Sequence, residues 1–236
     1  MVRNLCQPFR AASLWPGNKP SPQPYGTRRR AFGASLRVLL AAVPLLLAAS
    51  VAAQEYRSKA SGNWNALSTW EQDNGSGWVD ATVLPTNASG AITVRSPHTV
   101  TVSANVNLDD VTIESGGTVT TTTGSTTWVI NNGTFGVKVF GTFNANAAGG
   151  SFGCCGTVSI ENGGVVNMNA GGAFFGPTTV QAGGTVNGNT PINLGAGTIV
   201  NNGTWTMTGS NAITLNSGGT FTNNGALAWK AGTLSG

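Results

Sequence analysis

Two adjacent cysteines, Cys154 and Cys155, are the residues of this sequence best suited to covalent chemistry. Neighbouring side chains of a strand point to opposite faces, so both cannot face one core, and the glycines within 149–156 predict a loop. In an oxidising compartment such a pair can form a strained vicinal disulfide. Unpaired thiols or bonds to another chain are the alternatives. Two thiols with no histidine or further cysteine nearby are too few for a structural zinc site.

The only histidine, His98, follows Ser96 and Pro97 and has neither a nucleophile nor a carboxylate close to it in the sequence. A catalytic histidine needs such a partner within hydrogen-bond reach. We therefore interpret His98 as a polar residue in a turn between two strands.

The only pair of adjacent acids is Asp109 and Asp110. Apolar residues alternate over 100–108 and resume at Val111 with shifted parity, which predicts a corner at the pair, where aspartate is favoured for backbone reasons. We predict no catalytic, cofactor-binding or metal-binding residues. The alternative is a carbohydrate-active enzyme, a polysaccharide lyase or hydrolase, with Asp109, Asp110 and Glu114 along a groove. Such enzymes need clustered carboxylates, either across a glycosidic bond or around calcium.

An internal repeat indicates which elements position these residues. A short β-branched strand, a Gly-Gly turn and a second strand recur four times, and an Asn-Asn-Gly variant recurs three times. The seven segments are 111–119, 158–166, 178–186 and 213–221, and then 129–135, 199–205 and 221–227. Alternating apolar residues turn one side of each strand inward, and glycine or asparagine supplies the corner conformation. Stacked units then share one core, and asparagines of successive units can hydrogen-bond to one another.

These repeats predict an all-β parallel β-solenoid. Asn-Gly between strands is also a strong hairpin signal, so an antiparallel β-sandwich is the alternative. Repetition of one corner sequence favours the solenoid. Only 8% of residues are charged, against roughly 25% in ordinary soluble domains.

Residues 1–53 have the plan of a signal peptide with a long basic n-region. Seven of the 12 Lys and Arg residues precede residue 38, no acid precedes Glu55, and 38–49 is apolar. Small residues before the boundary predict cleavage between Ala53 and Gln54. The apolar run is shorter than the ~20 residues of a membrane span, so an uncleaved anchor is the lesser alternative. Arg29-Arg30 also resembles a twin-arginine export signal.

The net charge of +4 changes once this segment is set apart. From Gln54 onward there are five basic and eight acidic residues, a net charge of −3. A nucleic-acid partner is therefore not expected, and the membrane is involved only through the signal segment. We expect a protein exported through the inner membrane to the cell surface or the medium.

The residues that follow the signal segment resemble the opening of a known family. Gly62-Asn63-Trp64 and Thr69-Trp70 precede the strand pair of 91–102, which leads to the turn Gly116-Gly117-Thr118. This order resembles bacterial secreted or surface right-handed parallel β-helix proteins, such as adhesin-like proteins and autotransporter passengers. The resemblance implies an N-terminal cap followed by coils, and it carries no catalytic residues.

The predicted organisation is a signal peptide (1–53), a cap (54–90) and solenoid repeats (91–236) that are truncated at the C-terminus. Trp64, Trp70 and Trp78 are assigned to the cap. The later tryptophans, at 128, 205 and 229, are expected to fill the coils, with stacking on sugar rings as the alternative. The predicted function is that of a structural or adhesin-like surface protein without catalytic activity or cofactors, whose partners are surface glycans or other cell-surface proteins.

Overall fold

The computed structural model divides the chain into two compact units, residues 1–50 and 51–236. It describes residues within the second unit. The described ranges are 53–108, 110–122, 127–130, 136–147, 150–154, 156–174, 176–195, 197–208, 212–215, 218–229 and 234–235.

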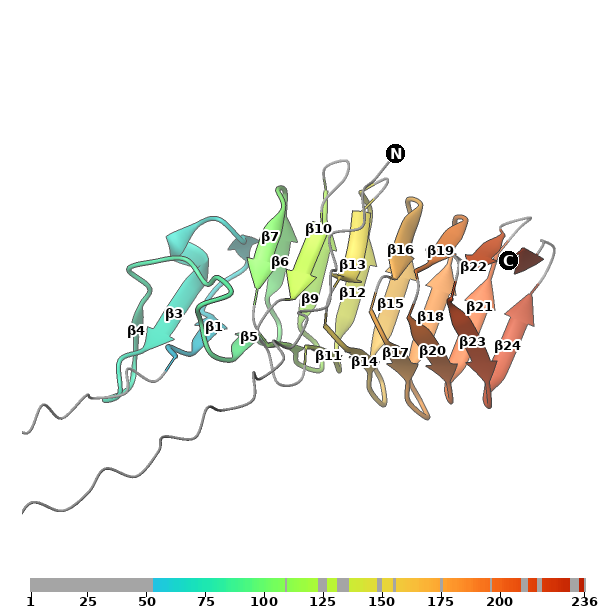
Figure 1. Ribbon diagram of the computed structural model, residues 1–236. Helices are drawn as coiled ribbons and strands as arrows, with labels where there is room; N and C mark the ends of the chain where they lie inside the picture. Colours follow the sequence, from blue (N-terminus) through green and yellow to red (C-terminus); the bar gives the residue numbers. More distant parts are fainter. Residues whose placement is uncertain are drawn as a thin grey trace, which may run out of the picture. The chain divides into compact units, whose positions relative to one another are not determined.

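From β5 onward, each three consecutive strands supply one strand to each of three sheets (Figure 1). The ten-stranded sheet runs in the order β23 (Thr220–Asn223), β20 (Thr198–Asn201), β17 (Thr178–Val180), β14 (Val158–Ile160), β11 (Val137–Val139), β8 (Val111–Ile113), β5 (Ile92–Val94), β1 (Tyr56–Ser58), β3 (Trp70–Asp73) and β4 (Trp78–Asp80). The eight-stranded sheet runs β2 (Gly62–Asn63), β6 (Thr99–Val102), β9 (Thr118–Thr121), β12 (Thr142–Ala145), β15 (Val165–Met168), β18 (Thr185–Gly188), β21 (Thr204–Met207) and β24 (Ala226–Trp229). The seven-stranded sheet runs β25 (Leu234–Ser235), β22 (Ile213–Leu215), β19 (Ile192–Leu194), β16 (Gly172–Phe174), β13 (Gly150–Cys154), β10 (Thr127–Ile130) and β7 (Val106–Leu108).

Each set of three consecutive strands forms one coil. Pairing between successive coils is parallel and in register, except for a register shift between β10 and β13. Val111 of β8 pairs with Val137 of β11, which pairs with Val158 of β14. Among the described strands, antiparallel pairing is limited to β1 with β3 and β3 with β4. The predicted parallel β-solenoid is therefore confirmed, and the alternative of an antiparallel sandwich is wrong.

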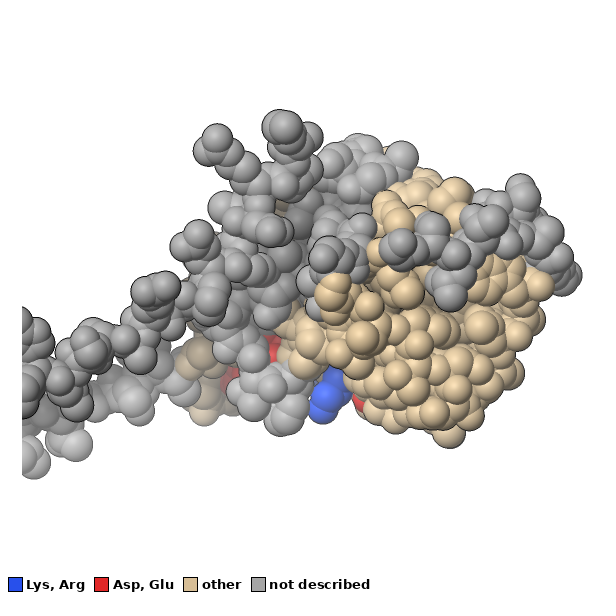
Figure 2. All heavy atoms as spheres, turned by 45° about the vertical axis from the view of Figure 1, so that its right-hand side comes forward, with Lys and Arg blue, Asp and Glu red and all other residues tan. Residues whose placement is uncertain are grey.

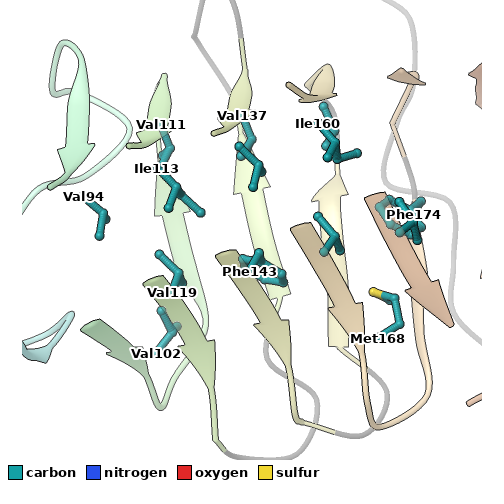
Figure 3. Close-up of a cluster of buried hydrophobic side chains, with 14 of the residues drawn as sticks. Val94, Val102, Val111, Ile113, Val119, Val137, Phe143, Ile160, Met168 and Phe174 are labelled. Atoms are coloured by element: carbon teal, nitrogen blue, oxygen red, sulfur yellow. The ribbon is translucent and has the colours of Figure 1, made fainter. Parts of the chain in front are cut away.

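The core lies inside the coils, between the three sheets. Strands of the ten-stranded sheet such as β8 alternate buried, half-buried and buried residues, so one side of each strand faces inward. Figure 3 shows these inward side chains approaching one another from different sheets, with Ile113, Val119 and Phe143 among them. Each coil alone is too thin to bury them, so stacking supplies the core.

Three corners between the ten-stranded and eight-stranded sheets, β8–β9, β14–β15 and β17–β18, share one turn. At the β14–β15 corner the N–H of Gly164 donates to the carbonyl of Glu161 (2.8 Å), and Gly163 has a φ of 82°. A side chain rarely adopts this left-handed backbone, which explains the first glycine of the Gly-Gly pair.

The Gly-Gly turns do not all lie at equivalent corners, although the sequence groups them together. Segments 111–119, 158–166 and 178–186 lead from the ten-stranded to the eight-stranded sheet, whereas 213–221 leads from the seven-stranded to the ten-stranded sheet. The first glycine of each pair has the same left-handed backbone, with a φ of 82° at Gly163 and 84° at Gly218.

Candidate functional site

Three charged side chains near the start of the solenoid form one cluster, in which Arg57 and Arg95 surround Glu71 of β3. Its Oε1 accepts from Arg57 Nε (2.5 Å) and lies 3.4 Å from Arg95 Nη1. The Arg57 guanidinium also lies 4.1 Å from the ring centroid of Trp78 on β4. Such partly exposed pairs contribute little stability individually. These contacts connect β1, through Arg57, to β3 and β4, and they connect β3 to Arg95, the residue after β5.

His98 lies in the turn between β5 and β6, as predicted. The turn includes a cis peptide bond between Ser96 and Pro97. The Nδ1 of His98 is 2.9 Å from the Oγ of Ser58. This Oγ also accepts a hydrogen bond from the backbone N–H of Arg95 at 2.9 Å. With one donor already directed at Oγ, the hydroxyl proton is available to Nδ1.

The Ser58–His98 pair was missed by sequence reasoning, because 40 residues separate its members. A serine beside a histidine can act as a nucleophile, but Ser58 is 0% exposed. A substrate cannot reach a hydroxyl that is fully covered by protein. The pair instead ties β1 to the first turn of the solenoid.

Asp110 occupies the predicted corner, between β7 and β8. Its Oδ1 accepts a hydrogen bond from the N–H of Gly136 in the next coil (2.8 Å), a structural role of the kind expected. Asp109 lies outside the described residues. Glu114 is exposed and follows β8, so four residues of extended chain, about 13 Å, separate it from Asp110. Paired glycosidase carboxylates lie about 5–9.5 Å apart.

Cys154 is the last residue of β13 and pairs with Val129 of β10, so the segment expected to be a loop is a strand up to this residue. Cys155 lies outside the described residues, and the vicinal disulfide remains a prediction. Ala53 and Gln54 are described, but the signal segment before them is not, so the cleavage site also remains a prediction. In the described part of the chain, no three His, Cys, Asp or Glu side chains gather into a metal site.

Most of the described tryptophan side chains pack inward. Trp64 and Trp70 are buried with ring centroids 4.7 Å apart, and Trp70 Nε1 donates to the carbonyl of Trp64 (2.8 Å). Trp205 is also buried, as expected, and Trp229 packs against the core. The side chain of Trp128 lies outside the described residues.

A shallow cleft lies between the chain after β4 and the first coil. It is lined by apolar groups, including Leu84 and Pro85, and by four amide side chains. These amides belong to Asn65, Asn87, Asn105 and Asn107. Amides both donate and accept hydrogen bonds, and three of these four, those of Asn87, Asn105 and Asn107, already interact with other groups of the protein.

Asparagine ladders run along the coils. Asn187 Nδ2 donates to Asn167 Oδ1 (2.9 Å), and Asn167 Nδ2 donates to Asn144 Oδ1 (2.8 Å). The predicted corner ladder is present where Asn224 Nδ2 donates to Asn202 Oδ1 (3.0 Å). The longer ladder lies on strand faces of the eight-stranded sheet, where the sequence did not predict one.

No family model matches the chain, and the comparisons with curated proteins and with solved structures give no match either. The described residues include no helix long and apolar enough to cross a membrane. The geometry thus defines a β-solenoid, and its function must be argued from the surface it presents.

Proposed function

We propose that the chain is a secreted or cell-surface, adhesin-like β-helix protein of bacterial type that acts by contact with other surfaces and not by catalysis. The observation that carries the proposal is the parallel register maintained from β5 to β24, which repeats one outward surface coil after coil. Most of the described surface in Figure 2 is neither acidic nor basic. A repeated, weakly charged surface suits extended contact.

We assign residues 54–90 to a cap over the first coil. The exposed edge of a parallel sheet invites further strand pairing. Here antiparallel β3 and β4 follow β1 at that edge, and Trp70, the first residue of β3, packs in the interior against Trp64. This arrangement supports a role in closing one end of the solenoid.

The proposed partners are surface glycans or other cell-surface proteins. The scarcity of charged side chains on the described surface in Figure 2 supports an uncharged partner, and neutral glycans are of this kind. The carbohydrate-active alternative gains less support. Asp110 is engaged by the Gly136 N–H, and its separation from Glu114 along the strand exceeds that of a carboxylate pair.

Expression of the full chain in a bacterial host, followed by fractionation and N-terminal sequencing, tests the proposal. We expect a mature N-terminus at Gln54 and protein on the surface or in the medium. A glycan array and a panel of polyuronide cleavage assays then separate binding from catalysis. Retention in the cytoplasm, or measurable polysaccharide cleavage, would contradict the proposal.

A further inference from the structure

The outward side of the eight-stranded sheet carries two straight ranks of small uncharged side chains, all of them polar except Val165. Each four-residue strand places its first and third residues outward, where they are half-buried or exposed, and its second residue inward, fully buried. The first rank is Thr99, Thr118, Thr142, Val165, Thr185 and Thr204, and the second is Thr101, Thr120, Asn144, Asn167, Asn187 and Thr206.

The two ranks form a lattice with fixed spacings. In-register parallel pairing places equivalent residues of neighbouring coils about 4.8 Å apart, and alternate residues of one strand about 6.7 Å apart. Threonine has a stiff χ1. The Asn144, Asn167 and Asn187 amides are hydrogen-bonded to one another, which fixes their positions. Little side-chain entropy is therefore lost when this face meets a rigid partner.

The chemistry of the face is restricted as well. At the described outward positions of the eight-stranded sheet, from β6 to β21, there is no charged residue and no aromatic residue, since Phe143 and Trp205 point inward and are 2% and 0% exposed. Sugar lattices favour exposed aromatic rings, which combine an apolar face with a polar edge. Charged groups hold their own water strongly. Neither feature is present on these strands.

An uncharged array of methyl, hydroxyl and amide groups that repeats in two directions matches one kind of partner best. That partner is a crystal whose surface is itself a lattice of hydrogen-bond donors and acceptors without charge. We propose that the outward face of the eight-stranded sheet binds ice. This inference goes beyond the proposed surface function and does not depend on where the protein is located.

The test measures ice recrystallisation and crystal shape in solutions of the purified chain. We compare Thr185→Lys, in the first rank, with Thr179→Lys, a half-buried outward threonine of β17 in the ten-stranded sheet. The parent should inhibit recrystallisation and facet the crystals. Thr185→Lys should need about tenfold more protein for the same effect, and Thr179→Lys should stay within about twofold of the parent.

Far-UV circular dichroism establishes that each variant retains its β-structure. If Thr185→Lys does not fold, Thr120→Lys on β9 and its control Thr112→Lys on β8 provide the same comparison. An inactive parent, or equal losses in the two members of a pair, overturns the proposal. Parent protein that sediments with insoluble chitin or cellulose through this face, while leaving ice unaffected, overturns it in favour of a polysaccharide.

Discussion

Several titratable and polar side chains of this protein join one strand or coil to the next. Asp110 accepts from the Gly136 N–H of the following coil, and Ser58 contacts both the Arg95 N–H and His98. The Ser58 hydroxyl is fully buried and therefore needs hydrogen-bond partners. At the residue scale, these contacts explain why side chains that could perform chemistry serve the fold.

Tyr56 gives stability a dependence on alkaline pH. It is 3% exposed, and burial raises the pKa of its phenol above the ordinary value of 10.0. The neutral form is favoured in the folded state, so its contribution to stability is present below pH 10 and is lost as the pH rises through the folded pKa. Urea unfolding of Tyr56→Phe should show a smaller loss of stability above about pH 10 than the parent. Equal pH profiles would refute this role for burial.

The state of Cys154 and Cys155 is decided by alkylation and mass spectrometry of protein exported to an oxidising compartment. A vicinal disulfide predicts no mass gain without reductant and two alkyl groups after reduction. A gain of two groups without reductant would show free thiols.

Corners are the elements that decide how closely two coils can stack. Gly163 has a positive φ and no atom within 4 Å of an added Cβ, whereas a Cβ on Gly164 would overlap the backbone carbonyl oxygen of Val139 in the preceding coil. The two positions of this Gly-Gly turn therefore require glycine for different physical reasons. The first supplies the bend, and the second allows the close approach of two backbones.

Alanine substitutions separate these two reasons. Gly163→Ala should cost roughly 1–2 kcal/mol from the left-handed backbone. Gly164→Ala should cost more, about 3 kcal/mol or above, because the neighbouring coil must shift. Urea unfolding monitored by circular dichroism measures both variants. A Gly163→Ala cost equal to or above that of Gly164→Ala would show that the clash is relieved without moving the coil.

Along the solenoid, each coil contacts mainly its neighbours, so stability is expected to vary along the chain. Trp205 is central to the later coils. Its ring centroid lies 5.8 Å from that of Phe174 and 5.3 Å from that of Phe221, and its side chain is 0% exposed.

Trp205→Ala should therefore destabilise the later coils selectively. Loss of a buried tryptophan costs about 3–5 kcal/mol. In hydrogen–deuterium exchange, β18, β21 and β24 should lose protection, while β5 and β8 keep theirs. A uniform loss of protection would mean that the solenoid unfolds as one cooperative unit.

The sequence by itself determined the fold class, because the alternation within strands and the glycine corners are local signals that recur. It also placed His98 in a turn and Asp110 at a corner, since turn chemistry needs only neighbouring residues. The sequence predicted a loop where the structure has strand β13 up to Cys154. Flanking glycines are also compatible with a strand that packs closely against its neighbours.

Only the tertiary structure decided which residues meet between coils. Contacts such as Ser58 with His98, or Asn187 with Asn167, join residues 40 and 20 positions apart. Coils differ in length, so the partner in the next coil does not lie at a constant separation in the sequence. The parallel register fixes these pairs, and with them the two ranks on the eight-stranded sheet, because it aligns each strand of that sheet from β6 to β21 with its equivalent in the next coil.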